Sequence, residues 1–235
     1  MCTRYISPDE SAAEREWRID ARNHGRIFNK VLLPSGRGLF IRRPKGAASG
    51  REMLAARWGL IPAFADKAEH PYATSNARSE ELSRKASFKG PWQQGQRCVI
   101  PALEFIEPNW ESGHHVPWGF KRADGGLWGL AGIWNTWIDP RTGEEHESYS
   151  MLTMHANSHA LMSRMHKPEM DKATRRPLPP EQQDKRSVIP IEQSNVDAWL
   201  AGTVDEALAL LRLSPAETFD AGPEEGYTLI QPSLF

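Results

Sequence analysis

One apolar stretch interleaved with glycine decides the fold class: Leu127-Trp128-Gly129-Leu130-Ala131-Gly132-Ile133-Trp134. A second run of the same kind follows at Tyr149–Met154, and the segment between them, Asp139–Gly143, carries the Asp, Pro and Gly residues that favour a turn. Short apolar runs bounded by turn residues predict buried β-strands rather than helices. The middle of the chain is therefore expected to be strand-rich.

The same pattern extends through most of the chain. Arg97–Pro101 predicts a short buried strand that contains Cys98, and Val31–Leu33 and Gly38–Arg42 flank the turn residues Pro34-Ser35-Gly36, which predicts a hairpin. Residues 167–186 are rich in charge and proline and predict an exposed loop.

Helices are expected to be fewer. Residues 195–200 predict a short helix, and Thr203-Val204-Asp205-Glu206 has the form of a capping box. Ala207, Leu208, Leu210 and Leu211 follow it at helical spacing. With 235 residues, the chain fits one α+β domain with a strand-dominated core.

The overall charge excludes a strongly basic or acidic protein, because the formal net charge is −1. Residues 1–60 nevertheless carry about six more basic than acidic side chains, by count along the sequence. Such an excess predicts either a local phosphate-binding face or an ordinary solvated surface.

The chain shows no sign of a secreted or membrane-bound protein. Its first 25 residues are polar and charged, which argues against a signal peptide, and no apolar run approaches the roughly 20 residues that span a bilayer. Two cysteines, Cys2 and Cys98, make neither a disulfide framework nor a four-cysteine metal site. We expect a cytoplasmic monomer without metal or cofactor, in which some of the nine tryptophans face a ligand.

The second residue, Cys2, has distinctive chemistry if Met1 is removed. An N-terminal cysteine carries a free α-amine, with a pKa of about 7.7–8.0, next to a thiol with a pKa of about 8.5. The amine condenses with an aldehyde to an imine, and the thiol closes the imine into a thiazolidine. On position alone, the sequence favours an ordinary residue of a first strand for Cys2.

Six segments, in order from residue 1 to about 213, resemble the SOS response-associated peptidase family, also described as abasic-site processing proteins. They are Met1-Cys2-Thr3-Arg4-Tyr5, Trp58-Gly59-Leu60-Ile61-Pro62, Asn76-Ala77-Arg78-Ser79-Glu80 followed by Phe88, Arg97-Cys98-Val99-Ile100-Pro101-Ala102 leading to Glu107, Gly129-Leu130-Ala131-Gly132-Ile133-Trp134, and Thr153-Met154-His155-Ala156-Asn157 with His166 downstream.

The resemblance implies a fold, a substrate and a site. The fold is one domain over residues 1–222 with a barrel-like mixed sheet core and a few peripheral helices, and residues 223–235 form a tail. The substrate is an abasic site in single-stranded DNA, whose ring-opened sugar is an aldehyde that Cys2 traps. By resemblance Glu107 deprotonates the Cys2 amine and assists removal of Met1, while His166 protonates the sugar ring oxygen. A surface glutamate and a loop histidine are the plainer alternatives.

Two departures from the family pattern affect these assignments. The family often has tryptophan directly after its glutamate, whereas here Pro108 follows Glu107 and the next tryptophan, Trp110, is the candidate substitute for any stacking role of that ring. The family histidine commonly lies in His-Asp-Arg-Met-Pro, whereas here an insertion follows His166. His155 and His159 are therefore alternative candidates.

Five further residues are candidates for DNA binding. Arg4, Asn76 and Arg78 offer amide and guanidinium donors for a phosphate or the aldehyde oxygen, or form a structural hydrogen-bond network instead. Trp58 and Trp92 are candidates for stacking on bases, although core packing is the commoner role and is favoured for Trp58.

The tail ends Gln231-Pro232-Ser233-Leu234-Phe235, which resembles the bacterial sliding-clamp binding peptide Gln-x-x-Leu-Phe. Gln231, Leu234 and Phe235 are thus candidate clamp contacts, unless the tail packs on its own domain. Two other functions remain open at this point: a thiol peptidase with Cys2 as nucleophile and His166 as base, and a non-covalent module that binds single-stranded DNA or the clamp.

Overall fold

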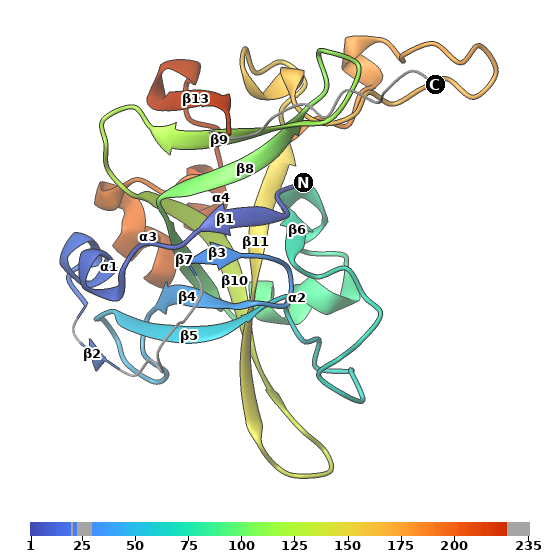
Figure 1. Ribbon diagram of the computed structural model, residues 1–235. Coiled ribbons are helices and arrows are strands. Elements are labelled where there is room, and N and C mark those ends of the chain that lie inside the picture. The colour runs from blue at the N-terminus through green and yellow to red at the C-terminus, as the bar shows by residue number, and fades with distance from the viewer. Residues whose placement is uncertain (20, 23–29, 225–235) are drawn as a thin grey trace.

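The computed structural model describes residues 1–19, 21–22 and 30–224, and Figure 1 shows their arrangement. The strands in this part of the chain are β1 (Arg4–Ile6), β2 (Ala21–Arg22), β3 (Val31–Leu32), β4 (Arg37–Arg42), β5 (Glu52–Trp58), β6 (Asn76–Arg78), β7 (Arg97–Ala102), β8 (Glu104–Asn109), β9 (Val116–Arg122), β10 (Trp128–Ile138), β11 (Glu145–His155), β12 (Arg186–Val188) and β13 (Phe219–Pro223). The α-helices are α1 (Glu10–Trp17), α2 (Ala86–Gln93), α3 (Val196–Ala201) and α4 (Val204–Leu210).

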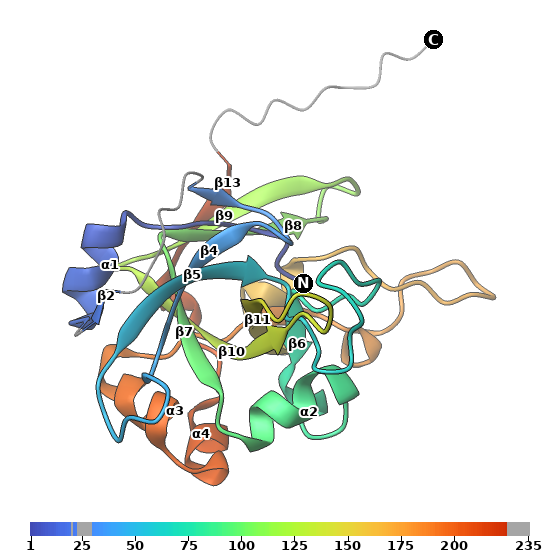
Figure 2. The same ribbon diagram turned by 90° about the horizontal axis from the view of Figure 1, so that it is seen from below.

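A closed, mixed sheet forms the centre of the molecule. Strands β11, β10, β7, β4 and β5 pair in that order and antiparallel, and β5 then returns to β11 in a parallel pairing at Tyr149↔Trp58. Closure removes the exposed edges that an open sheet would leave. Strands β12 and β6 add to β11, and Figure 2 shows the helices on the outside of this barrel.

A second, antiparallel sheet has the order β13-β9-β8-β1-β3. Its strand β1 is an interior strand, because it pairs with β3 on one side and with β8 on the other. The N-terminus therefore starts at the end of a fixed strand, and both views place it beside β6.

The two sheets meet at a buried pair of tyrosines. The hydroxyls of Tyr5 on β1 and Tyr149 on β11 lie 2.6 Å apart, and both rings are fully buried. Gly38 on β4 lets them approach, since a Cβ at that position would stand 2.4 Å from each hydroxyl. Around this contact lies one of two large apolar clusters, and the other packs under α1, α2 and α3.

The structure confirms the α+β fold class with a strand-dominated, barrel-like mixed sheet core and peripheral helices. Strands β7, β10 and β11 and the helix with its capping box at Thr203 and Glu206 lie where the sequence predicts them. The predicted hairpin of residues 31–42 is wrong, because β3 pairs with β1 while β4 pairs with β5 and β7. Among the described residues, no helix has the length and apolar character needed to cross a membrane.

Candidate active site

The site is built where the start of β1 meets β8. The antiparallel register sets Arg4 opposite Ile106, so Cys2 and Thr3 run alongside the end of β8 that carries Glu107. Glu107 is fully buried, and one of its oxygens, Oε1, has no hydrogen-bond partner among the described residues. A buried carboxylate oxygen without a partner is costly for folding, which marks this position as a functional candidate.

Three groups that exchange protons lie together at the N-terminus: the Met1 amine, the His166 imidazole and the Glu107 carboxylate. The α-amine of Met1 lies 2.6 Å from Nε2 of His166, and the same Nε2 lies 2.9 Å from Oε2 of Glu107. Glu107 Oε2 is 3.8 Å from the Met1 amine. A single imidazole nitrogen either accepts from the ammonium or donates to the carboxylate, but does not do both at once. One proton can therefore be shared between the amine, the imidazole and the carboxylate.

The Cys2 thiol is enclosed and held in its neutral form. Its S–H donates to the carbonyl oxygen of Arg4 at 3.3 Å, with that of Ile106 4.0 Å away. Burial, reinforced by the nearby Glu107 carboxylate, raises the pKa of the Cys2 thiol well above its usual range. The thiol thus differs from a protease nucleophile, whose pKa is depressed by a histidine or another positive neighbour.

Asn76 fixes the backbone of Cys2. Its Nδ2 donates to the Cys2 carbonyl at 2.7 Å, while its Oδ1 is buried without a partner among the described residues. Both Asn76 and Arg78 come from β6, which pairs with β11 in parallel. Arg78 forms an ion pair with Asp184 and keeps 39 % of its side chain exposed, so its guanidinium remains open to solvent.

Of the three candidate histidines, His166 is the one that contacts Glu107. It lies in the left-handed backbone region, with φ 63°, and its N–H donates to the carbonyl of Pro108 at 2.6 Å. His159 accepts the N–H groups of Leu161 and Met162 and so shapes a turn. His155 lies at the exposed end of β11, 3.6 Å from Asp184.

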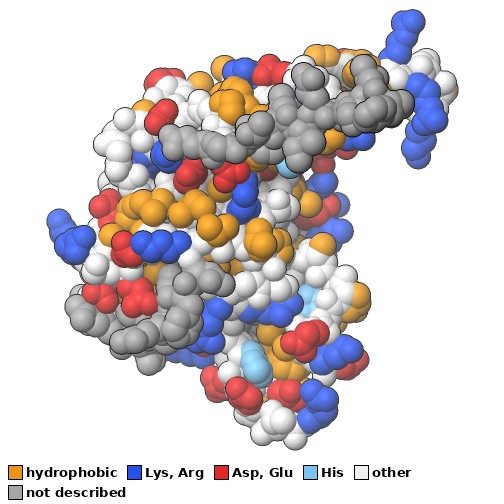
Figure 3. Space-filling view, in the orientation of Figure 1, with side chains coloured by type: hydrophobic (Ala, Val, Ile, Leu, Met, Phe, Trp, Pro, Cys, Tyr) orange, Lys and Arg blue, Asp and Glu red, His pale blue; other side chains and the backbone are white. Residues whose placement is uncertain are grey.

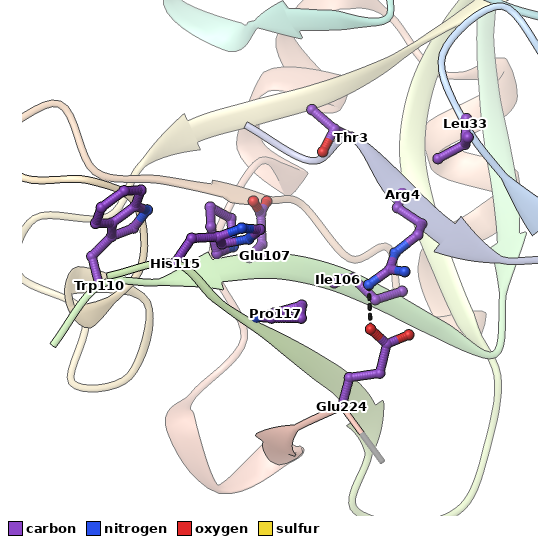
Figure 4. A pocket seen from close by; sticks show the side chains of 10 residues that line it. Thr3, Arg4, Leu33, Ile106, Glu107, Trp110, His115, Pro117 and Glu224 are labelled. Atoms are coloured by element: carbon purple, nitrogen blue, oxygen red, sulfur yellow. Dashed lines mark hydrogen bonds and ion pairs between the residues drawn. The ribbon is translucent and has the colours of Figure 1, made fainter. Parts of the chain in front are cut away.

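A pocket of about 610 Å³ lies beside this site, and Glu107 is the residue that the two share (Figure 4). Trp110 and His115 lie at one end of it, Arg4 and Glu224 at the other, and Glu107 between them. The rings of Trp110 and His115 stack at a centroid distance of 6.2 Å. The guanidinium of Arg4 pairs with the Glu224 carboxylate at 2.5 Å, so a cation suited to phosphate is already occupied by an acid of this chain.

The structure places both Trp58 and Trp92 in the core, the role that the sequence favours for Trp58, and not in a position to stack on bases. Trp58 is fully buried and donates its indole N–H to the carbonyl of Ser75, and Trp92 is 3 % exposed and packs near Trp199. Neither ring offers a free face. The tryptophan that lines the pocket is instead Trp110, three residues after Glu107, the candidate substitute for the tryptophan of the family pattern.

Surface charge does not form a single basic face on the side seen in Figure 3, where positive and negative side chains are interspersed. Several arginines of the basic N-terminal part are paired with acids. Arg42 is buried between Glu52 and Glu147, and Arg51 contacts Asp197. The phosphate-binding capacity near the site therefore rests on a few residues rather than on an overall field.

Two further points concern the C-terminal tail and metal binding. Gln231, Leu234 and Phe235, the candidate clamp contacts, lie outside the described residues. Within the described ranges, no group of three or more His, Cys, Asp and Glu residues is arranged to hold a metal ion.

Solved structures share this architecture. A protein from Bordetella bronchiseptica is 30 % identical to this chain, with a TM-score of 0.77, and the match covers 95 % of this chain and all of that one. A protein from Bacteroides thetaiotaomicron has the same fold at 23 % identity and a TM-score of 0.73, with coverage of 96 % and 93 %.

Curated relatives are similar over shorter segments. The abasic site processing protein HMCES of Gallus gallus is 29 % identical over 166 residues, which are 60 % of this chain and 49 % of that protein. The abasic site processing protein YoqW of Bacillus subtilis is 33 % identical over 111 residues, which are 47 % of this chain and 48 % of that protein. The matched part thus spans about half the length of these relatives.

The family assignment rests on nearly the whole chain. The model of the family described as SOS response associated peptidase (SRAP) matches residues 1–223, which include β1 with Cys2, β8 with Glu107, and His166. The chain belongs to the SOS response associated peptidase family.

Proposed function

We propose that this protein processes abasic sites in single-stranded DNA during the response to DNA damage, by forming a covalent crosslink through Cys2 after removal of Met1. The observation that carries the proposal is the convergence of His166 Nε2 and Glu107 Oε2 on the chain's first amine, at 2.6 and 3.8 Å. The names of the relatives, abasic site processing proteins, agree with it.

The first step is hydrolysis of the Met1–Cys2 peptide bond, which consumes one water and frees the Cys2 amine. We assign activation of that water to Glu107, the buried carboxylate nearest to the N-terminus. Asn76 holds the Cys2 carbonyl through this step, so the new amine stays beside the same carboxylate and imidazole. The peptidase activity of the proposal is limited to this one bond.

The second step joins the protein to DNA. The Cys2 amine adds to the aldehyde carbon of the open sugar, and loss of one water gives an imine. The thiol then adds its sulfur to the imine carbon, its proton passes to nitrogen, and a thiazolidine ring results. His166 protonates the sugar ring oxygen to open it, while Glu107 takes the proton from the Cys2 ammonium.

The state of the Cys2 thiol favours this chemistry over that of a thiol peptidase. A peptidase nucleophile is a thiolate made by a neighbouring base. Here the thiol donates to backbone carbonyls, burial raises its pKa, and no contact with His166 is found among the described residues. Addition to an imine differs in this respect, because the imine nitrogen itself takes the proton that the thiol loses as its sulfur adds.

The test uses single-stranded DNA with one abasic site, run on a denaturing gel after incubation with the protein. We expect a shifted band for the wild type and none for Cys2→Ala, for a form that retains an extra residue before Cys2, or for DNA blocked with methoxyamine. Cys98→Ala is the matched control and should crosslink normally, since Cys98 is an equally buried thiol but lies within β7, paired with Gly132, and carries no chain-end amine. A wild type that gives no band, or a Cys2→Ala variant that still gives one, rules the proposal out.

A further inference from the structure

We propose that Lys185 is a positioning residue that fixes His166 against Glu107; this rests on the proposed function for its kinetic test. Lys185 is 8 % exposed, and its ammonium donates to the carbonyls of Met165 and His166 at 2.7 and 2.8 Å. Among the described residues, no carboxylate forms an ion pair with this ammonium, and none contributes to the shift of its pKa. The hydrogen bonds that its ammonium donates thus go to the backbone that carries the histidine.

The backbone at His166 needs such support. A residue with a side chain rarely adopts a positive φ, and His166 does so at φ 63°. The carbonyls of Met165 and His166 both accept from the Lys185 ammonium, and the Pro108 carbonyl accepts the His166 N–H at 2.6 Å. These three hydrogen bonds hold the backbone in this conformation.

Lys185 is itself anchored independently of His166. Its N–H donates to Oδ1 of Asn157 at 2.8 Å, and its carbonyl accepts from Ala156 at 2.8 Å, which ties it to the end of β11. The segment of residues 167–183 lies between the two partners and projects from the body of the molecule (Figure 1). Lys185 therefore joins the end of this segment to the backbone of His166 at its start, so the segment does not displace His166 from the site.

The geometry also explains why burial of a lysine is tolerated here. Burial lowers the pKa of Lys185 from its ordinary value, because it removes water from around the ammonium. Two strong carbonyl acceptors compensate the loss of water around the ammonium. Neither the insertion nor the lysine needs to contact DNA for this role.

A double-mutant cycle tests the assignment. The rate of crosslinking at saturating DNA is measured for wild type, Lys185→Met, His166→Ala and the double variant. Because general acid catalysis contributes roughly 10²–10⁴-fold, a displaced His166 should cost about tenfold in Lys185→Met. In the His166→Ala background the same change should cost less than about twofold, since coupled residues are non-additive. Equal costs in both backgrounds would overturn the proposal.

Hydrogen exchange provides a readout that does not depend on the reaction. Exchange at the amide of His166 should be faster in Lys185→Met, while amides of β10 stay as in the wild type. Unchanged exchange at His166 would count against Lys185 even if the rate fell. If the wild type makes no crosslink, the proposed function fails and the exchange result still decides the role of Lys185.

One further variant is a control for general effects, and a second is a replacement for the test variant. Lys89→Met makes the same chemical change at an exposed lysine of α2 and should alter neither readout. Should Lys185→Met fail to fold by circular dichroism, Lys185→Gln replaces it in both measurements, because it removes the charge and keeps an N–H₂ group.

Discussion

Replacing Glu224 with glutamine should strengthen binding of single-stranded DNA, because Glu224 occupies Arg4. The two side chains are 30 % and 33 % exposed, and such solvent-screened pairs contribute at most about 1 kcal/mol. A phosphate that takes the Arg4 guanidinium must first displace the carboxylate. Removal of that competition should lower Kd up to about fivefold, the ratio that corresponds to 1 kcal/mol. One more phosphate contact should also steepen the salt dependence of log K by about 0.7 on single strands.

The assay is fluorescence anisotropy on a labelled single strand carrying a tetrahydrofuran abasic analogue, which has no aldehyde and so reports equilibrium binding. Glu217→Gln is the matched control, since it removes the same charge at an exposed position just before β13. In an Arg4→Gln background the Glu224→Gln effect should vanish. An equal gain from Glu217→Gln, or a gain that survives without Arg4, would show that net charge rather than this ion pair is responsible.

Three further predictions concern DNA binding, stability and pH. Trp110→Ala should weaken binding of the same analogue by about 1–3 kcal/mol, the contribution of one stacked base, and an unchanged Kd would exclude stacking there. Tyr149→Phe should lower the free energy of unfolding in urea by about 1–3 kcal/mol, since it leaves the buried Tyr5 hydroxyl unpaired, and Tyr5→Phe added to it should recover part of the loss. The hydrogen bond from Arg164, with help from Asn109, lowers the pKa of the Glu111 carboxyl to about 2. The ionised carboxylate therefore stabilises the folded state above the ordinary pKa of 4.5, and this stabilisation is lost as pH falls toward about 2. Stability measured at pH 5 and 2.5 should therefore change less in Glu111→Gln than in the wild type, and equal changes would contradict this account.

The strands that bound the barrel could be predicted from sequence because their signal is local. Residues 127–134 and 149–154 are apolar runs between turns, and both lie in paired strands. The pairing of β3 was not predictable in this way. Its neighbour in sequence, β4, joins the other sheet, and the partner of β3 is β1, a segment about 25 residues away whose match depends on the whole fold.

The site residues also divide into those with a local sequence signal and those without one. Cys2, Glu107 and Asn76 were candidates from short motifs, and the structure brings all three together with His166. Lys185 carried no signal, because it follows a long segment rich in charge and proline and acts through carbonyl groups that any residue possesses. For Trp92 the sequence left stacking and core packing open, because a tryptophan's identity alone does not say whether its ring faces solvent or the core.

The interior position of β1 has a mechanical consequence. Cys2 is attached to a strand that is hydrogen-bonded on both edges, to β3 and to β8. A DNA strand joined to Cys2 would transmit any pulling force from a translocating motor directly into those two ladders. Dislodging the protein by force would then require tearing β1 out of its sheet and separating the Tyr5–Tyr149 contact with it. The adduct would resist removal with the strength of the fold itself rather than that of a surface loop.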